Sequence, residues 1–431
     1  MRRLMESVAP AIGCVAIGLL LGTAHAWAGD AADSSSKPVA PGLREPGILQ
    51  RVAIETGLPD DKQSVLRGSD ARQQLIVTGS FAGGQTRDLT RSVAYEVSPE
   101  GIVHVDDTGL ATPLGDGTAT ISVRVEADLT ASTRIRVERF TEQIPINFAN
   151  QIVPIFTKLG CNSGGCHGKA SGQNGFKLSL LGFYPADDYE FLVKESRGRR
   201  LFPAAPDRSL LLEKATNRSP HGGGARVEPN SYEYRLLRRW IAQGMPYGSA
   251  ADPTVARIEV FPRERAMQRS GSQQVAVLAH YTDGSTEDVT RMTQFDANDT
   301  EMAEASATGL VQTRELTGDV AIMARYQGQV ATFRATVPLG LPIASYPEFP
   351  ANNFIDQHTL AKWKQLGIVP SDLCSDSEFI RRAMLDICGT TPTAEEVNAF
   401  VSNAAPDKRA KLVDQLLDRK DYADFFTLKW A

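Results

Sequence analysis

A duplicated segment constrains the fold of this chain more than any other feature. The run Gly84–Arg91 (GQTRDLTR) returns 200 residues later as Gly284–Arg291 (GSTEDVTR). The dipeptide Gly109-Leu110 returns at the same offset as Gly309-Leu310. Glycines and alternating strand residues that match at one offset indicate two copies of one domain.

Each copy has the pattern of a β-domain. In the first copy, short β-type runs such as Gln74–Val77, Ala94–Val97 and Thr120–Val125 are separated by turn residues. Such runs at regular spacing predict an antiparallel sandwich. We place the two copies at residues 48–140 and 254–338.

These motifs resemble the bacterial Ig-like domains of group 2. The family pattern is a Gly-Ser/Thr-rich hairpin, then Asp-Val-Thr, Gly-Leu-Val and Gly-x-Ala-x-Ile strands, the last of which begins here at Gly117 and Gly318. The resemblance implies two all-β Ig-like sandwiches.

The N-terminus carries an export signal. Arg2 and Arg3 precede an apolar run from Val8 to Leu21, and Ala24-His25-Ala26 offers a cleavage site between small residues. This layout predicts a signal peptide over residues 1–28, followed by a linker over 29–47. We therefore expect an exported protein of the periplasm or cell surface. We expect no transmembrane segment after cleavage, because no later run reaches about 18 uncharged apolar residues.

Length and charge limit the possible functions. The 431 residues suggest roughly three structural units. A net charge of -5 gives no general attraction to polyanions, so nucleic acid is not an expected partner. The sequence lacks the usual hydrolase motifs and a phosphate loop. These observations leave the enzyme question open but favour a carrier or scaffold over a catalyst.

Two segments outside the β-copies are predicted to be helical. Residues 141–250 contain an apolar stripe from Phe148 to Leu159 and an amphipathic run from Tyr232 to Gln243. In residues 350–431, Ser375-x-x-Glu378 and Thr393-x-x-Glu396 form capping boxes. The predicted fold class is thus multidomain: two β-sandwiches flank a mainly α module, and an α-helical segment follows.

One cluster has the residues for cofactor chemistry. Cys161, Cys166 and the adjacent His167 form a Cys-x4-Cys-His motif. Covalent haem attachment requires two nearby thiols with a histidine beside the second, although the usual gap is two residues. A local Cys161–Cys166 disulfide is equally consistent with an exported chain. A zinc site is disfavoured, because only His221 could add an imidazole within the segment.

The region around this motif resembles planctomycete cytochrome c-type proteins. The resemblance is carried by Gly160–Gly168, by Gly175–Phe183 (GFKLSLLGF), by His221–Gly224 and by Tyr234–Pro246. It implies a cytochrome c-like module with haem c bound to Cys161 and Cys166. His167 would be the proximal iron ligand, and an unidentified redox protein the partner.

The distal ligand must come from elsewhere in the module. We favour His221, because the three glycines after it allow close backbone approach to a flat ligand. Met245 is the alternative.

The tail resembles the start of a planctomycete domain of unknown function. Phe379–Asp386, Gly389–Thr393 and Trp430-Ala431 carry this likeness, and the family domain continues beyond the point where this chain stops. We therefore expect a truncated domain over residues 350–431.

The main functional prediction is an exported haem-binding electron-transfer protein with Ig-like scaffolding domains. One rival is a non-redox adhesion or scaffold protein with a Cys161–Cys166 disulfide. Another is an accessory part of an envelope system that processes polysaccharide. In either rival the partners would be cell-surface proteins or polysaccharide.

Overall fold

The computed structural model describes residues 42–59, 62–125, 129–341, 343, 346–348 and 351–431. The predicted signal peptide and most of the predicted linker lie outside the described residues. Within them, no helix is both long and apolar enough to cross a membrane.

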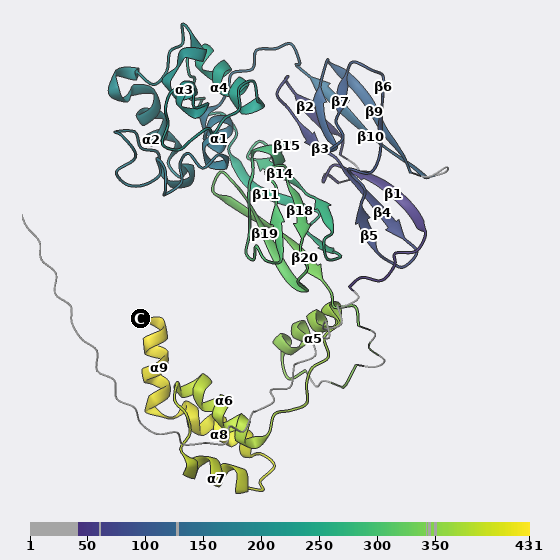
Figure 1. Ribbon diagram of the computed structural model, residues 1–431, viewed down its shortest axis with the longest axis vertical. Helices are drawn as coiled ribbons and strands as arrows, with labels where there is room; N and C mark the ends of the chain where they lie inside the picture. The colour runs from purple at the N-terminus through teal and green to yellow at the C-terminus, as the bar shows by residue number, and fades with distance from the viewer. Residues whose placement is uncertain (1–41, 60–61, 126–128, 342, 344–345, 349–350) are drawn as a thin grey trace, which may run out of the picture. The chain divides into compact units, whose positions relative to one another are not determined.

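The first β-domain (residues 49–138) contains three small sheets (Figure 1). Their strand orders are β1-β4-β5, β2-β10-β9-β6 and β3-β8-β7. Side chains alternate between the two faces of a strand, so β9 buries Ala119, Ile121 and Val123 in the core. The strands are β1 (Leu49–Glu55), β2 (Ser64–Arg67), β3 (Gln73–Gln74), β4 (Ile76–Phe81), β5 (Thr86–Asp88), β6 (Tyr95–Ser98), β7 (Val103–Val105), β8 (Leu110–Pro113), β9 (Gly117–Val125) and β10 (Leu129–Glu138).

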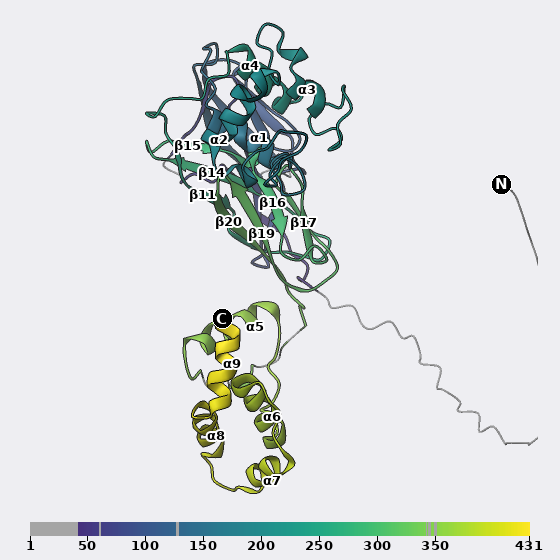
Figure 2. The same ribbon diagram turned by 90° about the vertical axis from the view of Figure 1, so that its left-hand side faces the viewer.

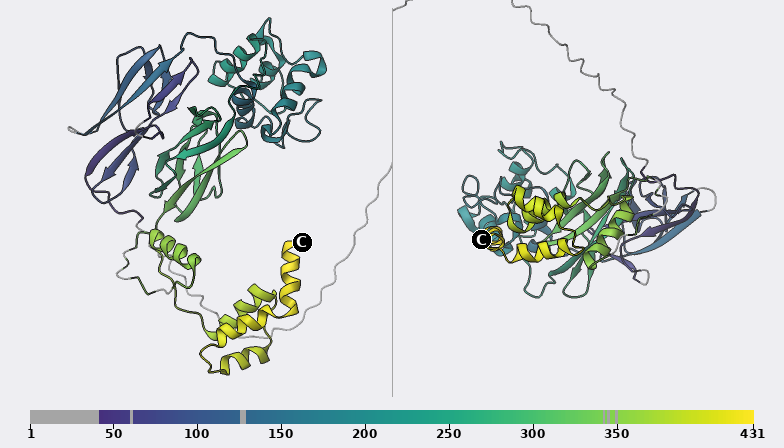
Figure 3. Two further views of the ribbon diagram at one scale, coloured as in Figure 1. Left: turned by 180° about the vertical axis from the view of Figure 1, so that it is seen from behind. Right: turned by 90° about the horizontal axis from the view of Figure 1, so that it is seen from below.

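The second β-domain (residues 255–337), green in Figure 3, repeats this topology strand for strand. Its sheets have the orders β11-β14-β15, β12-β20-β19-β16 and β13-β18-β17. The predicted duplication is therefore confirmed by the strand order. The strands are β11 (Val255–Phe261), β12 (Glu264–Ala266), β13 (Ser272–Gln274), β14 (Ala276–Tyr281), β15 (Thr286–Asp288), β16 (Gln294–Ala297), β17 (Ala303–Ala305), β18 (Leu310–Thr313), β19 (Gly318–Tyr326) and β20 (Gln329–Val337).

The predicted purely antiparallel pairing is wrong at one strand pair in each domain. Strand β2 lies parallel to β10, and β12 lies parallel to β20. Parallel neighbours require a long connection between them. That connection is available here because most of each domain lies between the two paired strands.

The central module (residues 141–250) folds around Trp240 and Phe148, whose side chains are fully buried. Their ring centres are 5.4 Å apart. The helices are α1 (Val153–Lys158), α2 (Pro185–Tyr189), α3 (Leu210–Ala215) and α4 (Tyr232–Ala242) (Figure 2). Short π- and 3₁₀-helical turns precede α1 or lie between the helices: η1 (Phe148–Ile152), η2 (Leu180–Gly182), η3 (Glu190–Lys194), η4 (Glu195–Gly198) and η5 (Pro206–Arg208).

The expected apolar helix before Cys161 is divided into two pieces. A π-helical turn, η1, runs to Ile152, and α1 begins at Val153 with Pro154 in its first turn. Proline fits the first turn of a helix, where its missing N–H would have no intrahelical acceptor. Pro154 therefore starts the helix that leads to Cys161 rather than interrupting it.

The C-terminal helices confirm the predicted helical tail. They are α5 (Phe354–Leu366), α6 (Asp376–Cys388), α7 (Ala394–Ser402), α8 (Lys408–Leu417) and α9 (Lys420–Trp430). Ser375 accepts a hydrogen bond from the backbone N–H of Glu378, and Thr393 and Glu396 form a complete capping box. Gly389 ends α6 in the left-handed conformation.

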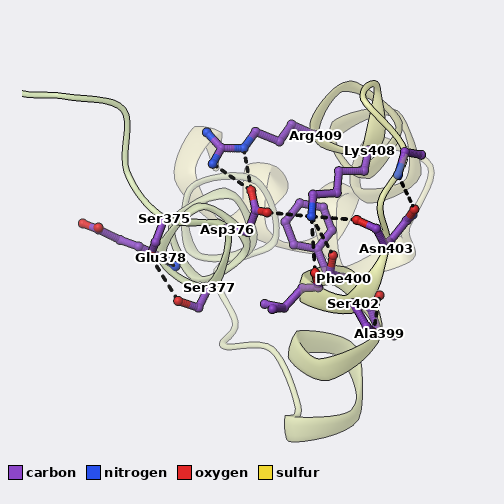
Figure 4. Close-up of polar contacts among 12 residues, drawn as sticks. Ser375, Asp376, Ser377, Glu378, Ala399, Phe400, Ser402, Asn403, Lys408 and Arg409 are labelled. Carbon is purple, nitrogen blue, oxygen red and sulfur yellow. Dashed lines mark hydrogen bonds and ion pairs between the residues drawn. The ribbon is translucent and has the colours of Figure 1, made fainter.

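Asp376 joins three of these helices (Figure 4). Its carboxylate accepts two hydrogen bonds from Arg409, at 2.9 and 2.7 Å, and pairs with the Lys408 ammonium at 2.6 Å. Lys408 also donates to the carbonyl oxygens of Phe400 and Asn403 at the end of α7. Cations near a helix C-terminus satisfy its open carbonyl groups. These contacts fix the start of α6 against α7 and α8.

The two β-domains are joined by reciprocal hydrogen bonds, here called the clasp. The backbone N–H of Gln74 donates to Asp288 at 2.7 Å, and that of Gln274 donates to Asp88 at 2.6 Å. Arg291 donates to the Gln74 side chain at 3.1 Å. The matching contact, from Arg91 to the Gln274 side chain, measures 3.2 Å. Each carboxylate thus binds the open edge of a short strand in the other domain. This contact makes the sheet edge unavailable for pairing with another strand.

We predict that Asp288→Ala and Asp88→Ala lower the free energy of unfolding by similar amounts. Each change removes the acceptor of a buried backbone N–H, which costs about 1–3 kcal/mol. Chemical denaturation would measure the loss. The control is Asp107→Ala, an exposed position, where the expected change is within about 0.5 kcal/mol. Losses no larger than in the control would mean that the clasp contributes nothing.

Candidate functional site

The Cys161–Gly168 loop follows α1 directly and is folded back on itself. The backbone N–H of Cys161 donates to Phe156 at 2.8 Å, and that of His167 donates to the carbonyl of Cys161 at 3.0 Å. Asn162 is buried, and its amide donates to the Thr157 hydroxyl at 2.9 Å. These bonds fold the loop onto the end of α1, and Cys161, Cys166 and His167 all border one cavity.

Gly168 is the glycine that this loop requires. A Cβ atom there would lie 2.0 Å from the carbonyl oxygen of Asn162, far inside van der Waals contact. Gly164 and Gly165 also lie in this loop. Neither has a positive φ, and a Cβ on Gly165 would meet no atom within 4 Å. In the sequence, this sterically restricted position could have been recognised as the glycine that directly follows Cys166-His167.

His167 and His221 face each other with nearly parallel rings. Their ring centres are 6.3 Å apart and their planes differ by 8°. His167 Nδ1 lies 2.9 Å from the carbonyl oxygen of Phe176, and His221 Nδ1 lies 2.9 Å from that of Gly224. A carbonyl accepts only from a protonated nitrogen, so each ring donates from Nδ1, and Nε2 is the nitrogen that could bind a metal. Metal-ligating histidines usually make such a hydrogen bond to a backbone carbonyl.

The two imidazoles lie close enough to border one cofactor site, because their ring centres are 6.3 Å apart. Among the described residues, no group of three or more His, Cys, Asp or Glu side chains could hold a metal ion. Two imidazoles are too few for a structural zinc site. They are the number that a haem iron takes when the porphyrin supplies its other four nitrogens.

A cavity of about 610 Å³ adjoins both histidines and both cysteines. Its size is within the range of about 300–1,000 Å³ of ligand pockets, which are mostly apolar. The apolar side chains of its wall include Ile155, Phe156, Leu159, Leu178, Leu211 and Leu237. The fit of the residues to a flat apolar cofactor therefore rests on both the histidine pair and this wall.

Met245 is not among the residues that line this cavity. Its carbonyl oxygen accepts a hydrogen bond from the Tyr189 hydroxyl at 2.6 Å, and its side chain packs against the core of the module. The structure thus brings His221, and not the alternative Met245, to His167.

Burial controls the protonation of the site. It raises the pKa of the Cys161 thiol to about 11, against the opposing charge of Arg226. It also lowers the pKa of His167, and the neighbouring His221 and Arg200 act in the same direction. At neutral pH the site therefore offers a neutral imidazole at His167 and a protonated thiol at Cys161.

Two residues that build the site were not recognised as functional from the sequence. Phe176 orients His167 through its carbonyl, and its ring centre lies 4.6 Å from that of His167. Arg200 is buried and donates to the carbonyl oxygens of Phe191, Glu195 and Gly175. It holds the backbone just before Phe176. The only sequence signal was the GFKLSLLGF run, which begins at Gly175.

The C-terminal segment matches a known family model. Residues 354–431 match PSCyt2, described as a protein of unknown function (DUF1549). This match confirms the prediction that the tail resembles a planctomycete domain of unknown function. The matched residues do not reach the β-domains or the central module.

Other similarities are distant. Ice-binding protein 1 of Shewanella frigidimarina is 24% identical over 298 residues, which cover 68% of this chain and 30% of that protein. The chain thus spans about 30% of the length of this relative. Among solved structures, the S-layer protein rSbsC(31-844) shares 10% identity, covering 69% of this chain and 29% of that one, with a TM-score of 0.19. The tandem Ig repeats of Dlar share 6% identity, covering 67% and 94%, with a TM-score of 0.15. Neither TM-score supports an inference.

We predict that Gly168→Ala destabilises the central module, by about 3 kcal/mol, because overpacking against backbone displaces the loop. Gly165→Ala is the matched control, and its expected effect is within about 0.5 kcal/mol. Thermal and chemical unfolding would measure both variants. Equal stability of the two would contradict the loop geometry described above.

We also predict that His167 makes the protein less stable in acid. Because the folded-state pKa of His167 lies below the unfolded value of about 6.5, the unfolded chain binds more protons between these two values. Its contribution to stability is therefore present above pH 6.5 and is lost as the pH falls through this interval. Denaturation of the haem-free protein from pH 7.5 to 5 should show a smaller decline for His167→Gln than for wild type. Parallel curves would argue against the depressed pKa.

Proposed function

We propose that this chain is an exported scaffold protein whose two β-domains hold a haem-binding, electron-transferring module. The observation that carries the haem assignment is the pair of parallel imidazoles, His167 and His221, with ring centres 6.3 Å apart. Both have Nδ1 hydrogen-bonded to backbone carbonyls and Nε2 available. Export, and hence a place in the periplasm or at the cell surface, rests on the N-terminal signal pattern.

Each residue of the site has a defined role in this proposal. Cys161 and Cys166 would hold the haem through thioether bonds, and His167 and His221 would bind its iron through Nε2. The carbonyls of Phe176 and Gly224 fix the orientation of the two rings. Bound haem supplies a one-electron iron couple, whose potential depends on its axial ligands and on burial. The apolar wall keeps water from the ligands.

The β-domains are proposed to be bacterial Ig-like domains of group 2 that act as spacers. Their duplicated motifs and identical strand orders support this assignment. In this role they place the module at a defined position for a redox partner protein at or near the cell surface.

A scaffold without haem is the second candidate. It is supported by the similarity to a relative named ice-binding protein 1, which favours a surface role over a redox role. In this alternative Cys161 and Cys166 form a disulfide and the histidines are structural. Surface proteins or polysaccharide are the partners.

Haem staining on a denaturing gel separates the two candidates. We predict that protein matured in a host competent for c-type haem attachment retains the stain, because only covalently linked haem survives denaturation. Cys161→Ser/Cys166→Ser should lose it. His221→Ala should keep the stain but change the visible spectrum, because the distal ligand is lost. His104→Ala, at an exposed position of β7, is the control and should leave both unchanged.

The absence of the haem stain would decide for the second candidate. If the matured wild-type protein shows no stain and peptide mapping finds Cys161 bonded to Cys166, the haem proposal is wrong. The scaffold candidate then remains.

A further inference from the structure

A second cavity lies where the first β-domain, the central module and the second β-domain meet. It measures about 370 Å³, and its wall includes Arg72 from the first domain, Tyr232 and Arg239 from α4, and Glu287 from the second domain. This volume is at the lower end of the range of about 300–1,000 Å³ for small-molecule sites. It shares none of its lining residues with the cavity beside His167.

Arg72 is the unusual residue of this cavity. The central carbon of its guanidinium lies 3.1 Å from the centre of the Tyr232 ring. In the described part of the chain, no oxygen accepts a hydrogen bond from this guanidinium and no carboxylate forms an ion pair with it. Its pKa is lowered, chiefly by burial. Buried charges in proteins are normally paired.

The carboxylates around Arg72 are already engaged by other groups. Asp70 forms an ion pair with Arg239, and Glu233 lies 3.9 Å from the Lys158 ammonium. Glu287 accepts a hydrogen bond from the Tyr281 hydroxyl at 3.2 Å.

The remaining acidic residues of the wall are engaged as well. Asp288 accepts from the backbone N–H of Gln74 at 2.7 Å, and Glu142 accepts from Arg139 at 2.7 Å. The positive charge of Arg72 therefore has no carboxylate in direct contact: Asp70 and Glu233 attract it from a distance while pairing with other cations.

Lys158 adds to the positive field. Its pKa is lowered to about 8, chiefly by burial; the carboxylate of Glu233 opposes this shift, and the charges of Arg72 and Arg291 add to it. Three cations from three parts of the chain are thus close enough to disfavour one another. An anion bound at Arg72 would relieve this repulsion.

We propose that this cavity binds a hydroxylated organic acid of monosaccharide size, with its carboxylate on Arg72. The planar guanidinium can offer a carboxylate two parallel hydrogen bonds. Stacking on Tyr232 holds the guanidinium plane in place. The side-chain amide nitrogen of Gln151, which also lines the cavity, can donate to a hydroxyl group. This site is independent of the proposed haem function and goes beyond it.

Calorimetric titration of the full chain tests the proposal, with glucuronate as the probe and glucose and acetate as comparators. We expect glucuronate to bind at least about tenfold more tightly than either comparator, since glucose lacks the charge and acetate the hydroxyl groups. Arg72→Gln should weaken glucuronate binding at least about tenfold. Arg72→Lys should also weaken it, because lysine keeps the charge but cannot offer a carboxylate two parallel hydrogen bonds. Arg197→Ala, at an exposed position of η4, should bind as wild type does.

Thermal unfolding of the same proteins provides a second readout. Without ligand, Arg72→Gln should unfold at or above the wild-type temperature, because the change removes a charge that burial disfavours. Glucuronate should raise the unfolding temperature of wild type but not that of this variant. The proposal is overturned if glucuronate fails to bind, if glucose or acetate binds as tightly, or if Arg72→Gln and Arg72→Lys both retain wild-type affinity.

Discussion

The arrangement of the β-domains depends on two equivalent hydrogen bonds, whose acceptors Asp88 and Asp288 lie 200 residues apart in the sequence. In Asp88 and in Asp288, one carboxylate oxygen accepts a hydrogen bond from a threonine backbone N–H of the same domain. The other oxygen accepts one from a glutamine backbone N–H of the other domain. Closing so long a loop costs entropy that grows only slowly with its length. A few buried hydrogen bonds with good geometry can therefore join distant parts of the chain. The central module lies within the loop that they close.

The histidine pair depends on the backbone rather than on helices. His167 and His221 both lie in loops, and each ring is held by a carbonyl oxygen close in sequence. A side chain on a loop is placed accurately only when the loop itself is rigid. The crowding at Gly168 and the buried Arg200 supply that rigidity here. The loop next to the cavity is thus shaped by contacts that involve no cofactor.

Sequence reasoning reached the elements whose signals are local. The capping residues Ser375 and Thr393, the stop at Gly389 and the duplicated strands are patterns of a few residues, and each is found where it was expected. The parallel pairing of β2 with β10 was missed, because it joins segments about 70 residues apart with no local mark. The cavity around Arg72 was missed for the same reason: its wall comes from three parts of the chain. Cys161, Cys166 and His167 were identified from the sequence because covalent haem attachment requires a histidine directly after the second cysteine. The position of His221 near His167 has no such local motif, and the sequence offered it only as the favoured one of two candidates.

The ends of the central module meet. The Asn147 side chain donates to Asp252 at 2.8 Å, and that of Asn150 donates to the carbonyl of Pro253 at 2.8 Å. The chain therefore enters and leaves the module at nearly the same point, as it does in inserted domains. A segment joined in this way can change in length without moving the strands on either side. The duplicated β-domains thus form a frame that other inserts with adjacent ends could occupy, and the present insert is one that brings two histidines together.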